Sequence, residues 1–292
     1  LGIHRASLFA VLHDAVLKAG IAIKPKRYLT GILATAAGPK LLFDQEDAGP
    51  FDMVVNATGA RSALSGGEAV ELPFAALWTT VDMPGGTSIA RASLDQRYWG
   101  ASKMAGIMPI GINPDSGMPG AALFWSMKPA AMDTMRITGI DKWRSEFTDL
   151  WPEAAGFVAQ IESFDALTLA IYRHRTGKPV GGPGIFHLGD AWHCTSPQLG
   201  QGANMALIDA AALSSAVEMT ISLSEAATVY RNLRGDHVAL YQFLSRVFTP
   251  LYQSNSLSLA WIRDAVIHHG ARWPGVRWLI AKVVSGSFGN PA

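Results

Sequence analysis

Cysteine and charge are both scarce in this sequence. Its 292 residues include a single cysteine, Cys194, which excludes a disulfide framework within the chain and indicates a reducing compartment. Charged side chains make up 16% of the residues, against roughly 25% in an average soluble domain. The 24 basic and 23 acidic side chains almost cancel, which argues against the broad positive field that nucleic-acid binding requires.

Long hydrophobic runs are also lacking. A membrane-spanning helix needs about 20 consecutive, mostly apolar residues, and no such run occurs. The pattern of a secretory signal is missing as well, so we expect a cytoplasmic protein. The hydrophobic content of 49% is nevertheless sufficient to form a core, which excludes general disorder.

Basic side chains are concentrated near the C-terminus. From Glu225 onward there are seven basic and three acidic residues, a net charge of +4. Such asymmetry can mark a surface that meets an anionic partner. We therefore expect a peripheral membrane contact through the basic C-terminal helices, with packing of those helices on the rest of the protein as the alternative.

Apolar periodicity predicts the order of the elements. In the first third we expect a helix, a short strand, a hairpin and a buried strand, at His4–Ala19, Ile21–Ile23, Gly38-Pro39 and Phe51–Ala57. Short apolar segments between turn residues then predict an antiparallel sheet, with strands at Leu77–Val81, Arg97–Trp99, Gly106–Gly111 and Ala121–Met127. The last third is predicted to be helical, at Leu223–Phe248, Ser256–His268 and Val276–Val284.

The most informative segment is Gly184–Leu213, GIFHLGDAWHCTSPQLGQGANMALIDAAAL. It begins as a strand, continues through Gly189-Asp190 into an irregular loop, and ends in a Gly-rich turn that opens a helix after Gly202. Free N–H groups at a helix N-terminus bind anionic groups, and glycines let the backbone approach them closely. Asp190 follows a strand end, where acidic residues of dinucleotide folds accept hydrogen bonds from a sugar.

This segment resembles the GDAAHxxxPxxGQGxNxxxxDAxxL signature of the FAD-dependent aromatic-ring monooxygenases, the group of para-hydroxybenzoate hydroxylase and the ubiquinone-biosynthesis hydroxylases. The stretch Gly2–Leu8 resembles their arginine-bearing helix. The resemblance implies a mixed α/β fold, with a Rossmann-like FAD-binding domain, an inserted antiparallel substrate-binding sheet and a helical C-terminal region. The expected divisions are 1–70 with 165–222, then 71–164, then 223–292.

The resemblance also implies roles for individual residues. Asp190 would bind the FAD ribose, Pro197 would lie beside the isoalloxazine ring, and the backbone of Gly200–Asn204 would cover the pyrimidine edge of the flavin. The implied cofactor-binding set is Arg5, Thr58, Gly59, Gly189, Asp190, Pro197, Gly200, Gln201, Gly202, Ala203 and Asn204. The implied substrate-binding set is Tyr98, Trp99, Met108 and Trp125. No residue is assigned as catalytic, and no metal site is expected.

Two departures from the family pattern bear on the function. The GxGxxG motif of the first βαβ unit is absent, so the resemblance implies that this unit lies before Leu1. At the end of the second strand motif, Asn56-Ala57-Thr58-Gly59 has Thr58 in place of an acidic residue. That sequence resembles the strand ends of styrene monooxygenases and flavin-dependent halogenases, which receive reduced flavin from a separate reductase.

The resemblance therefore implies an enzyme that hydroxylates an aromatic or hydrophobic small molecule through a flavin hydroperoxide, with FAD as cofactor, O₂ as co-substrate and NAD(P)H as electron donor. One alternative is a two-component monooxygenase or halogenase with a flavin reductase as partner. The other is a non-catalytic flavin-fold protein that binds a ligand or partner.

Overall fold

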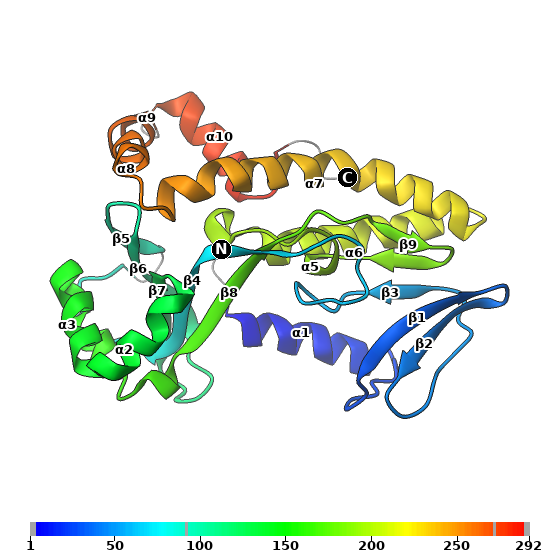
Figure 1. Ribbon diagram of the computed structural model, residues 1–292, viewed down its shortest axis with the longest axis horizontal. Coiled ribbons are helices and arrows are strands. Elements are labelled where there is room, and N and C mark those ends of the chain that lie inside the picture. The colour runs from blue at the N-terminus through cyan, green and yellow to red at the C-terminus, as the bar shows by residue number, and fades with distance from the viewer. Residues whose placement is uncertain (1–3, 91–92, 271–272, 289–292) are drawn as a thin grey trace. The chain divides into compact units, whose positions relative to one another are not determined.

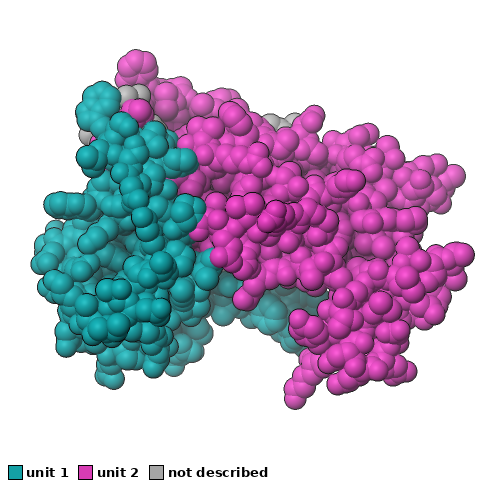
Figure 2. All heavy atoms as spheres, in the orientation of Figure 1, with its two compact units in different colours: residues 1–23, 73–171, 250–261 teal, residues 24–72, 172–249, 262–292 magenta. Residues whose placement is uncertain are grey.

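The computed structural model describes residues 4–90, 93–270 and 273–288 (Figure 1). It contains two compact units (Figure 2). Unit 1 comprises residues 1–23, 73–171 and 250–261, and unit 2 comprises residues 24–72, 172–249 and 262–292. These units are defined by compactness alone, and the functional division expected from the sequence remains a prediction.

Unit 1 is built on an antiparallel sheet, as the sequence predicts. Its five strands have the order β5-β6-β7-β4-β8. Their bounds are β4 Val70–Asp82, β5 Asp95–Trp99, β6 Lys103–Ile112, β7 Pro119–Met127 and β8 Thr168–His174. Strand β6 pairs with both β5 and β7, and β7 pairs with β4, all antiparallel.

The helices of unit 1 are mostly short. They are α1 Arg5–Lys18, α2 Met132–Thr138, α3 Ile140–Leu150, α4 Ala155–Val158 and α8 Leu257–Ile262, with single 3₁₀ turns at Pro129–Ala131, Pro152–Ala154 and Phe164–Ala166. Helix α3 buries Trp143 and Phe147, whose rings lie 6.4 and 5.3 Å from that of Trp125 on the sheet. This aromatic group is the centre of the core of unit 1.

Helix α1 occupies nearly the predicted span, but the strand predicted after it is wrong. Ile21 and Ile23 are 58% and 49% exposed and belong to no strand. A short apolar run becomes a strand only where a neighbouring strand pairs with it, and no described strand does so here. Gly2 and Ile3, which contribute to the resemblance of the first helix, lie outside the described residues.

Unit 2 contains a hairpin and a small mixed sheet. The hairpin joins β1 Leu29–Thr35 to β2 Gly38–Phe43, where the sequence predicts one. The mixed sheet has the order β3-β10-β9, with bounds Val54–Asn56, Ile185–His187 and Val180–Gly182. Strand β10 is parallel to β3 and antiparallel to β9. The fold is therefore mixed α/β, as expected.

Helices cover much of unit 2. They are α5 Asp190–His193, α6 Gly202–Glu218, α7 Leu223–Tyr252, α9 His268–Gly270 and α10 Pro274–Val284, with a 3₁₀ turn at Pro197–Leu199 and a π-helical turn at Arg263–Ile267. The predicted end of α7 at Phe248 is too early, because the helix continues past Pro250. Phe186, Trp192 and Tyr230 are central to the core. No helix in the described part of the chain is long and apolar enough to cross a membrane.

Candidate functional site

Two parallel strands of unit 2 end side by side. Strands β3 and β10 are in register, with Asn56 opposite His187 at their last positions. Thr58-Gly59 follows β3, and Gly189-Asp190 follows β10. Ligands of α/β folds bind beyond the carboxyl ends of parallel strands. The two segments that the sequence singles out therefore lie at one such edge.

A polar network fixes the turn after β3. The Asn56 side chain accepts hydrogen bonds from the N–H and hydroxyl of Thr58, at 3.2 and 2.7 Å. Its amide nitrogen lies 2.8 Å from His187 Nδ1 and 3.2 Å from Ser62 Oγ. Burial, and the positive charge of Arg175, lower the pKa of His187, so Nδ1 is available as an acceptor. The network holds Thr58 and Gly59 in place.

Gly189 shapes the turn after β10. Its φ of +53° lies in the region that favours glycine, and a Cβ on it would come within 2.9 Å of Ala206 on α6. The next residue, Asp190, is exposed at the start of α5. Its Oδ1 would be 3.9 Å from a Cβ on Gly202. The Asp190 carboxylate therefore lies beside the N-terminus of α6.

The turn before α6 leaves that N-terminus open. Gly200 has a φ of +63° and ends the 3₁₀ turn that begins at Pro197, and no described side chain caps α6. Gly202 and Ala203 are exposed. The first N–H groups of a helix lack partners within the helix and carry partial positive charge. They can therefore donate to an anionic or carbonyl-bearing ligand beside Asp190.

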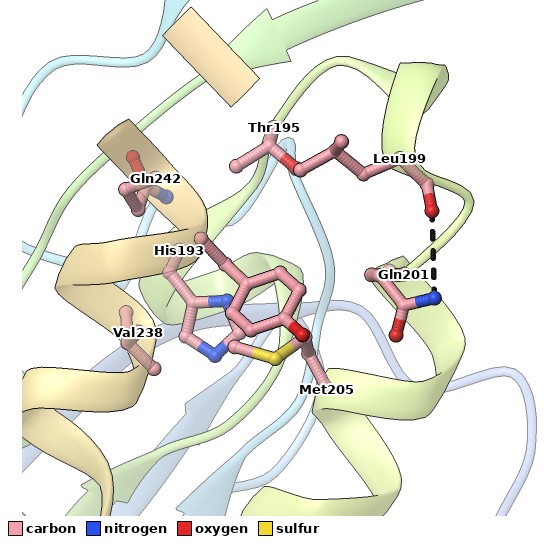
Figure 3. Close-up of a pocket in the computed structure, with 9 residues that line it drawn as sticks. His193, Thr195, Leu199, Gln201, Met205, Val238 and Gln242 are labelled. Carbon is pink, nitrogen blue, oxygen red and sulfur yellow. Dashed lines mark hydrogen bonds between the residues drawn. The ribbon is translucent and has the colours of Figure 1, made fainter. Parts of the chain in front are cut away.

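The side chains of this turn form hydrogen bonds within the protein. Gln201 donates to the carbonyl of Leu199 at 3.4 Å (Figure 3) and to the carbonyl of Val284. Asn204 donates to Gln201 Oε1 at 2.9 Å. Gln201 and Asn204 thus tie the turn together and to the end of α10, while Gly202 and Ala203 at the start of α6 are exposed.

A buried charged group supports the turn after β10. Asp209 on α6 is fully buried and accepts from Arg234 Nε at 2.8 Å. Its other oxygen accepts from the Gly189 N–H at 2.9 Å and lies 2.6 Å from His193 Nε2. Burial by itself raises the pKa of Asp209, but the hydrogen bonds and charges of His193 and Arg234 outweigh it and lower the pKa overall. The Asp209 carboxylate therefore positions Gly189, the residue before Asp190.

The buried group extends through α7 to the segment after α10. Arg234 Nη1 lies 2.6 Å from His237 Nδ1, and His237 Nε2 lies 3.2 Å from the carbonyl of Gly286. Burial, and the charge of Arg234, lower the pKa of His237 to about 4. His237 is therefore neutral near pH 7, with Nδ1 accepting from Arg234 and Nε2 donating to Gly286.

A separate cavity of about 520 Å³ lies next to the turn after β3. Three arginines line it, Arg61, Arg173 and Arg175. Arg175 is buried and donates to the carbonyl of Ser62 at 3.0 Å, whereas Arg173 pairs with Glu71. The Nε of Arg175 is buried and has no hydrogen-bond partner among the described residues. Glu68 also lines the cavity, but the arginines outnumber it, which suits an anionic group.

The other expected site residues lie in unit 1. Arg5 is exposed at the first position of α1. Trp99 is 71% exposed and lines a cavity of about 220 Å³ with residues that include Lys103 and Glu146. Tyr98 is half-buried against Tyr252, with ring centroids 5.5 Å apart. Met108 is half-buried on β6, and Trp125 packs in the core.

The sequence did not predict the buried group of Asp209, His193, Arg234 and His237. Asp209 and His193 are part of the quoted motif, but a motif does not reveal that they meet. Arg234 and His237 carry no motif at all. One signal was available, because a charged residue at an inward position of an amphipathic helix requires a partner.

Part of the chain matches a known family model. Residues 140–228 match the family model of the FAD binding domain. No curated protein matches the chain. Several solved structures share the fold. HpxO of Klebsiella pneumoniae, complexed with FAD and uric acid, is 18% identical with a TM-score of 0.76, over 99% of this chain and 72% of HpxO.

Two further structures show the same likeness. PqsL of Pseudomonas aeruginosa, a probable FAD-dependent monooxygenase, is 17% identical with a TM-score of 0.67, over 87% of this chain and 72% of PqsL. The flavin-dependent brominase Bmp2 is 15% identical with a TM-score of 0.68, over 97% of this chain and 70% of Bmp2. This chain therefore shares the fold of these flavoproteins, and its residues 140–228 match the FAD binding domain.

Proposed function

We propose that the protein is an FAD-dependent monooxygenase that hydroxylates an aromatic or hydrophobic small molecule. One observation carries the proposal: the uncapped N-terminus of α6 lies beside the exposed carboxylate of Asp190, at the carboxyl ends of two parallel strands. A flavin offers a carbonyl-bearing ring edge, which accepts hydrogen bonds, and a sugar chain, which donates them. The N-terminus of α6 therefore fits the ring edge of FAD, and Asp190 fits its sugar.

Each residue has a proposed task toward FAD. Asp190 accepts hydrogen bonds from the ribose, and the backbone N–H groups at the start of α6 donate to the pyrimidine edge. Pro197 and Gly200 shape the loop beside the ring, and Thr58-Gly59 lines the adjoining strand end. Arg5 is the proposed partner of the phosphates or ribose. Bound FAD supplies the redox chemistry, accepting electrons and activating O₂.

The chain contributes electrostatics and position to that chemistry. The positive end of the α6 dipole stabilises negative charge on the pyrimidine edge. Asp209 holds the Gly189 N–H, and so sets where Asp190 lies relative to α6. Tyr98 and Met108, which share one face of the sheet of residues 71–164, are proposed to provide the apolar environment of the substrate, whereas Trp99 and Trp125 lie on the face that packs against α3. That HpxO is complexed with uric acid supports a flat aromatic substrate.

NAD(P)H is the proposed electron donor. The support is the cavity lined by Arg61, Arg173 and Arg175, since guanidinium groups bind phosphates. A second candidate is a protein that receives reduced flavin from a separate reductase. Thr58, in place of the acidic residue of the hydroxylase motif, favours this candidate.

Anaerobic flavin reduction tests the proposal and separates the two candidates. The intact protein is loaded with FAD and mixed with NADH or NADPH, with uric acid and para-hydroxybenzoate as substrate probes. Bleaching of the flavin without a reductase, followed by O₂ uptake in air, is expected for the first candidate. Bleaching only after a flavin reductase is added favours the second. A protein that binds no FAD contradicts both.

A further inference from the structure

Arg175 carries a buried positive charge that no carboxylate in the described part of the chain neutralises. The residue is 6% exposed, and the ion pairs formed within the described residues do not include it. Burial is the main cause that lowers the pKa of nearby His187 and raises the pKa of Cys194, so both side chains are neutral near pH 7. A buried charge without a counter-charge is unfavourable. A bound anion would supply that counter-charge.

The backbone and one side-chain nitrogen of Arg175 are held by hydrogen bonds. Its backbone N–H donates to the Cys194 carbonyl at 3.0 Å, and its carbonyl accepts from Gln242 Nε2 at 2.9 Å. Nη1 of the guanidinium donates to the Ser62 carbonyl at 3.0 Å. The guanidinium is therefore fixed in place before any ligand arrives.

Another edge of this guanidinium has an unused donor. Nε of Arg175 is buried and has no hydrogen-bond partner among the described residues. In arginine the Nε–H and one N–H of Nη2 point the same way along one edge, which donates two parallel hydrogen bonds to a carboxylate or phosphate. Buried polar atoms of proteins nearly always have a partner. An oxyanion from outside the chain would complete this edge.

Arg175 lines the cavity of about 520 Å³ together with Ser65 and Arg61. Ser65 Oγ accepts from Asn56 Nδ2 at 3.1 Å, which leaves the hydroxyl proton of Ser65 to donate to a ligand. Arg61 is exposed and adds further donors. The cavity thus brings together donors from three side chains. A terminal phosphate offers three oxygens to them, whereas a carboxylate offers two.

Two acidic side chains oppose the arginines around this cavity. Glu71 pairs with Arg173, so the charges of these two residues cancel. Glu68 lines the cavity, but it is exposed, as Arg61 is, and water and salt screen exposed charges. The buried charge of Arg175 is screened least. It therefore keeps this side of the cavity positive.

We propose that this cavity binds a phosphate group of a nucleotide, with the Nε and Nη2 edge of Arg175 donating two hydrogen bonds to it. Ser65 and Arg61 donate to its remaining oxygens. The volume of about 520 Å³ lies in the range of small-molecule and cofactor sites. The inference rests on the proposed function, because the nucleotide is taken to be the NAD(P)H donor, and it names Arg175 as the residue that holds the phosphate.

Calorimetric titration of the intact protein with 2′,5′-ADP and with adenosine tests the site, because the two probes differ only in their phosphates. 2′,5′-ADP should bind at least about tenfold more tightly than adenosine. Arg175→Lys keeps the charge but loses the two-donor edge, and should weaken 2′,5′-ADP binding about tenfold or more. Arg61→Gln should weaken it about tenfold. Glu68→Gln should tighten it, because the opposing charge is removed.

Arg231→Gln is the matched control, since Arg231 is an exposed arginine that lines a different cavity of unit 2. It should leave the affinity for 2′,5′-ADP within about twofold. Circular dichroism checks that each variant is folded. The exposed variants Arg61→Gln and Glu68→Gln carry the test if Arg175→Lys does not fold.

NMR detection of the arginine ¹⁵Nε–H signals gives a second readout. The signal that is missing in Arg175→Lys identifies Arg175 in the wild-type spectrum. It should shift when 2′,5′-ADP is added and stay in place when adenosine is added, because the phosphate accepts from this N–H.

Equal affinities for the two probes would overturn the proposal. So would Arg61→Gln and Glu68→Gln proteins that bind 2′,5′-ADP as Arg231→Gln does. An Arg175 signal that moves with benzoate and not with 2′,5′-ADP would show that the ligand is a carboxylate. An Arg175 signal that moves with FAD would assign the phosphate to the flavin, and either result would also overturn the proposal.

Failure of this site and failure of the proposed function are distinguishable. A protein that binds 2′,5′-ADP in this manner, but whose flavin is not reduced by NAD(P)H, supports the phosphate site and contradicts the proposed donor. A protein whose flavin is reduced by NAD(P)H, with an Arg175 signal that does not move, keeps the proposed function and overturns the phosphate site.

Discussion

Asp209 and Arg234 form an ion pair with no exposed surface, in which Arg234 Nε donates to Asp209 Oδ1 at 2.8 Å. The pair joins α6 to α7 and, through the second oxygen of Asp209, holds the Gly189 N–H. A charge this deeply buried is stable only while its partner is present. The turn that presents Asp190 thus depends on an arginine 44 residues farther along the chain.

Asp209→Asn should strongly destabilise the protein, because it removes the negative charge that pairs with the buried Arg234 guanidinium. We expect a loss of about 3–5 kcal/mol in the free energy of unfolding, measured by urea titration. The double variant Asp209→Leu with Arg234→Met should cost less than the sum of the single variants. Glu146→Gln, in an exposed pair with Lys103, is the control and should cost less than about 1 kcal/mol. Equal losses in Asp209→Asn and Glu146→Gln would contradict the role assigned to the buried pair.

Stability should fall as the pH is lowered from about 6.5 toward 4, because the pKa of His237 is lowered from 6.5 to about 4. In that window the unfolded chain binds a proton that the folded protein does not, which favours unfolding. The contribution of His237 is at most about 3 kcal/mol. Urea titrations at several pH values should show a smaller slope for His237→Gln than for the wild type. His187 and His174, whose pKa values are also lowered, should account for the remaining slope. An unchanged slope in His237→Gln would contradict this account.

Two glycines at the site should respond differently to alanine. Gly189→Ala places a Cβ at 2.9 Å from Ala206 on a backbone with positive φ, and should cost about 1–3 kcal/mol in unfolding free energy. At Gly202 the nearest atom to a Cβ is 3.9 Å away, which is ordinary contact. Gly202→Ala should therefore leave the stability unchanged and weaken FAD binding by obstructing approach to the helix N-terminus. Differential scanning calorimetry and FAD titration measure the two effects. A destabilised Gly202→Ala, or a tolerated Gly189→Ala, would show that the turn is built differently.

The arginine-lined cavity should affect the electron donor and not the flavin. Arg61 is exposed, so Arg61→Gln should preserve the fold and raise the KM for NAD(P)H about tenfold, the change expected for one lost phosphate contact of about 1.4 kcal/mol. FAD affinity should be unchanged. Arg136→Gln, which removes an exposed pair with Asp165, is the matched control. If Arg61→Gln and Arg136→Gln have the same KM, the cavity is not the donor site.

The sequence predicts local features of this protein better than its long-range contacts. The Gly-rich turn and the start of α6 at Gly202 are confirmed, because positive φ and helix N-termini have local signals. The antiparallel sheet predicted for the middle of the chain is also confirmed, because the turn residues between its strands are a local signal. The segment of the four-residue helix α5 was expected to be irregular loop; His193 at its end contacts the buried Asp209, which is distant in the sequence.

Contacts between distant residues have no comparable signal. Asn56 and His187 are 131 positions apart and meet because β3 and β10 are parallel neighbours. Nothing in either segment specifies that pairing. The strand predicted at Ile21–Ile23 failed for the converse reason, because apolar residues without a paired strand leave their side chains in solvent. Site residues in short motifs were therefore accessible from the sequence, and the residues that hold them were not.

Titration of the intact protein with FAD, comparing Asp190→Ala with Asp236→Ala, tests the central claim most directly. Both variants remove one exposed carboxylate from unit 2, but only Asp190 lies beside the N-terminus of α6. Asp190→Ala should weaken FAD binding about 10- to 150-fold, which corresponds to the loss of a charge-assisted hydrogen bond of about 1.5–3 kcal/mol. Asp236→Ala should bind FAD as the wild type does. Unchanged affinity in a folded Asp190→Ala protein would contradict the proposed flavin site.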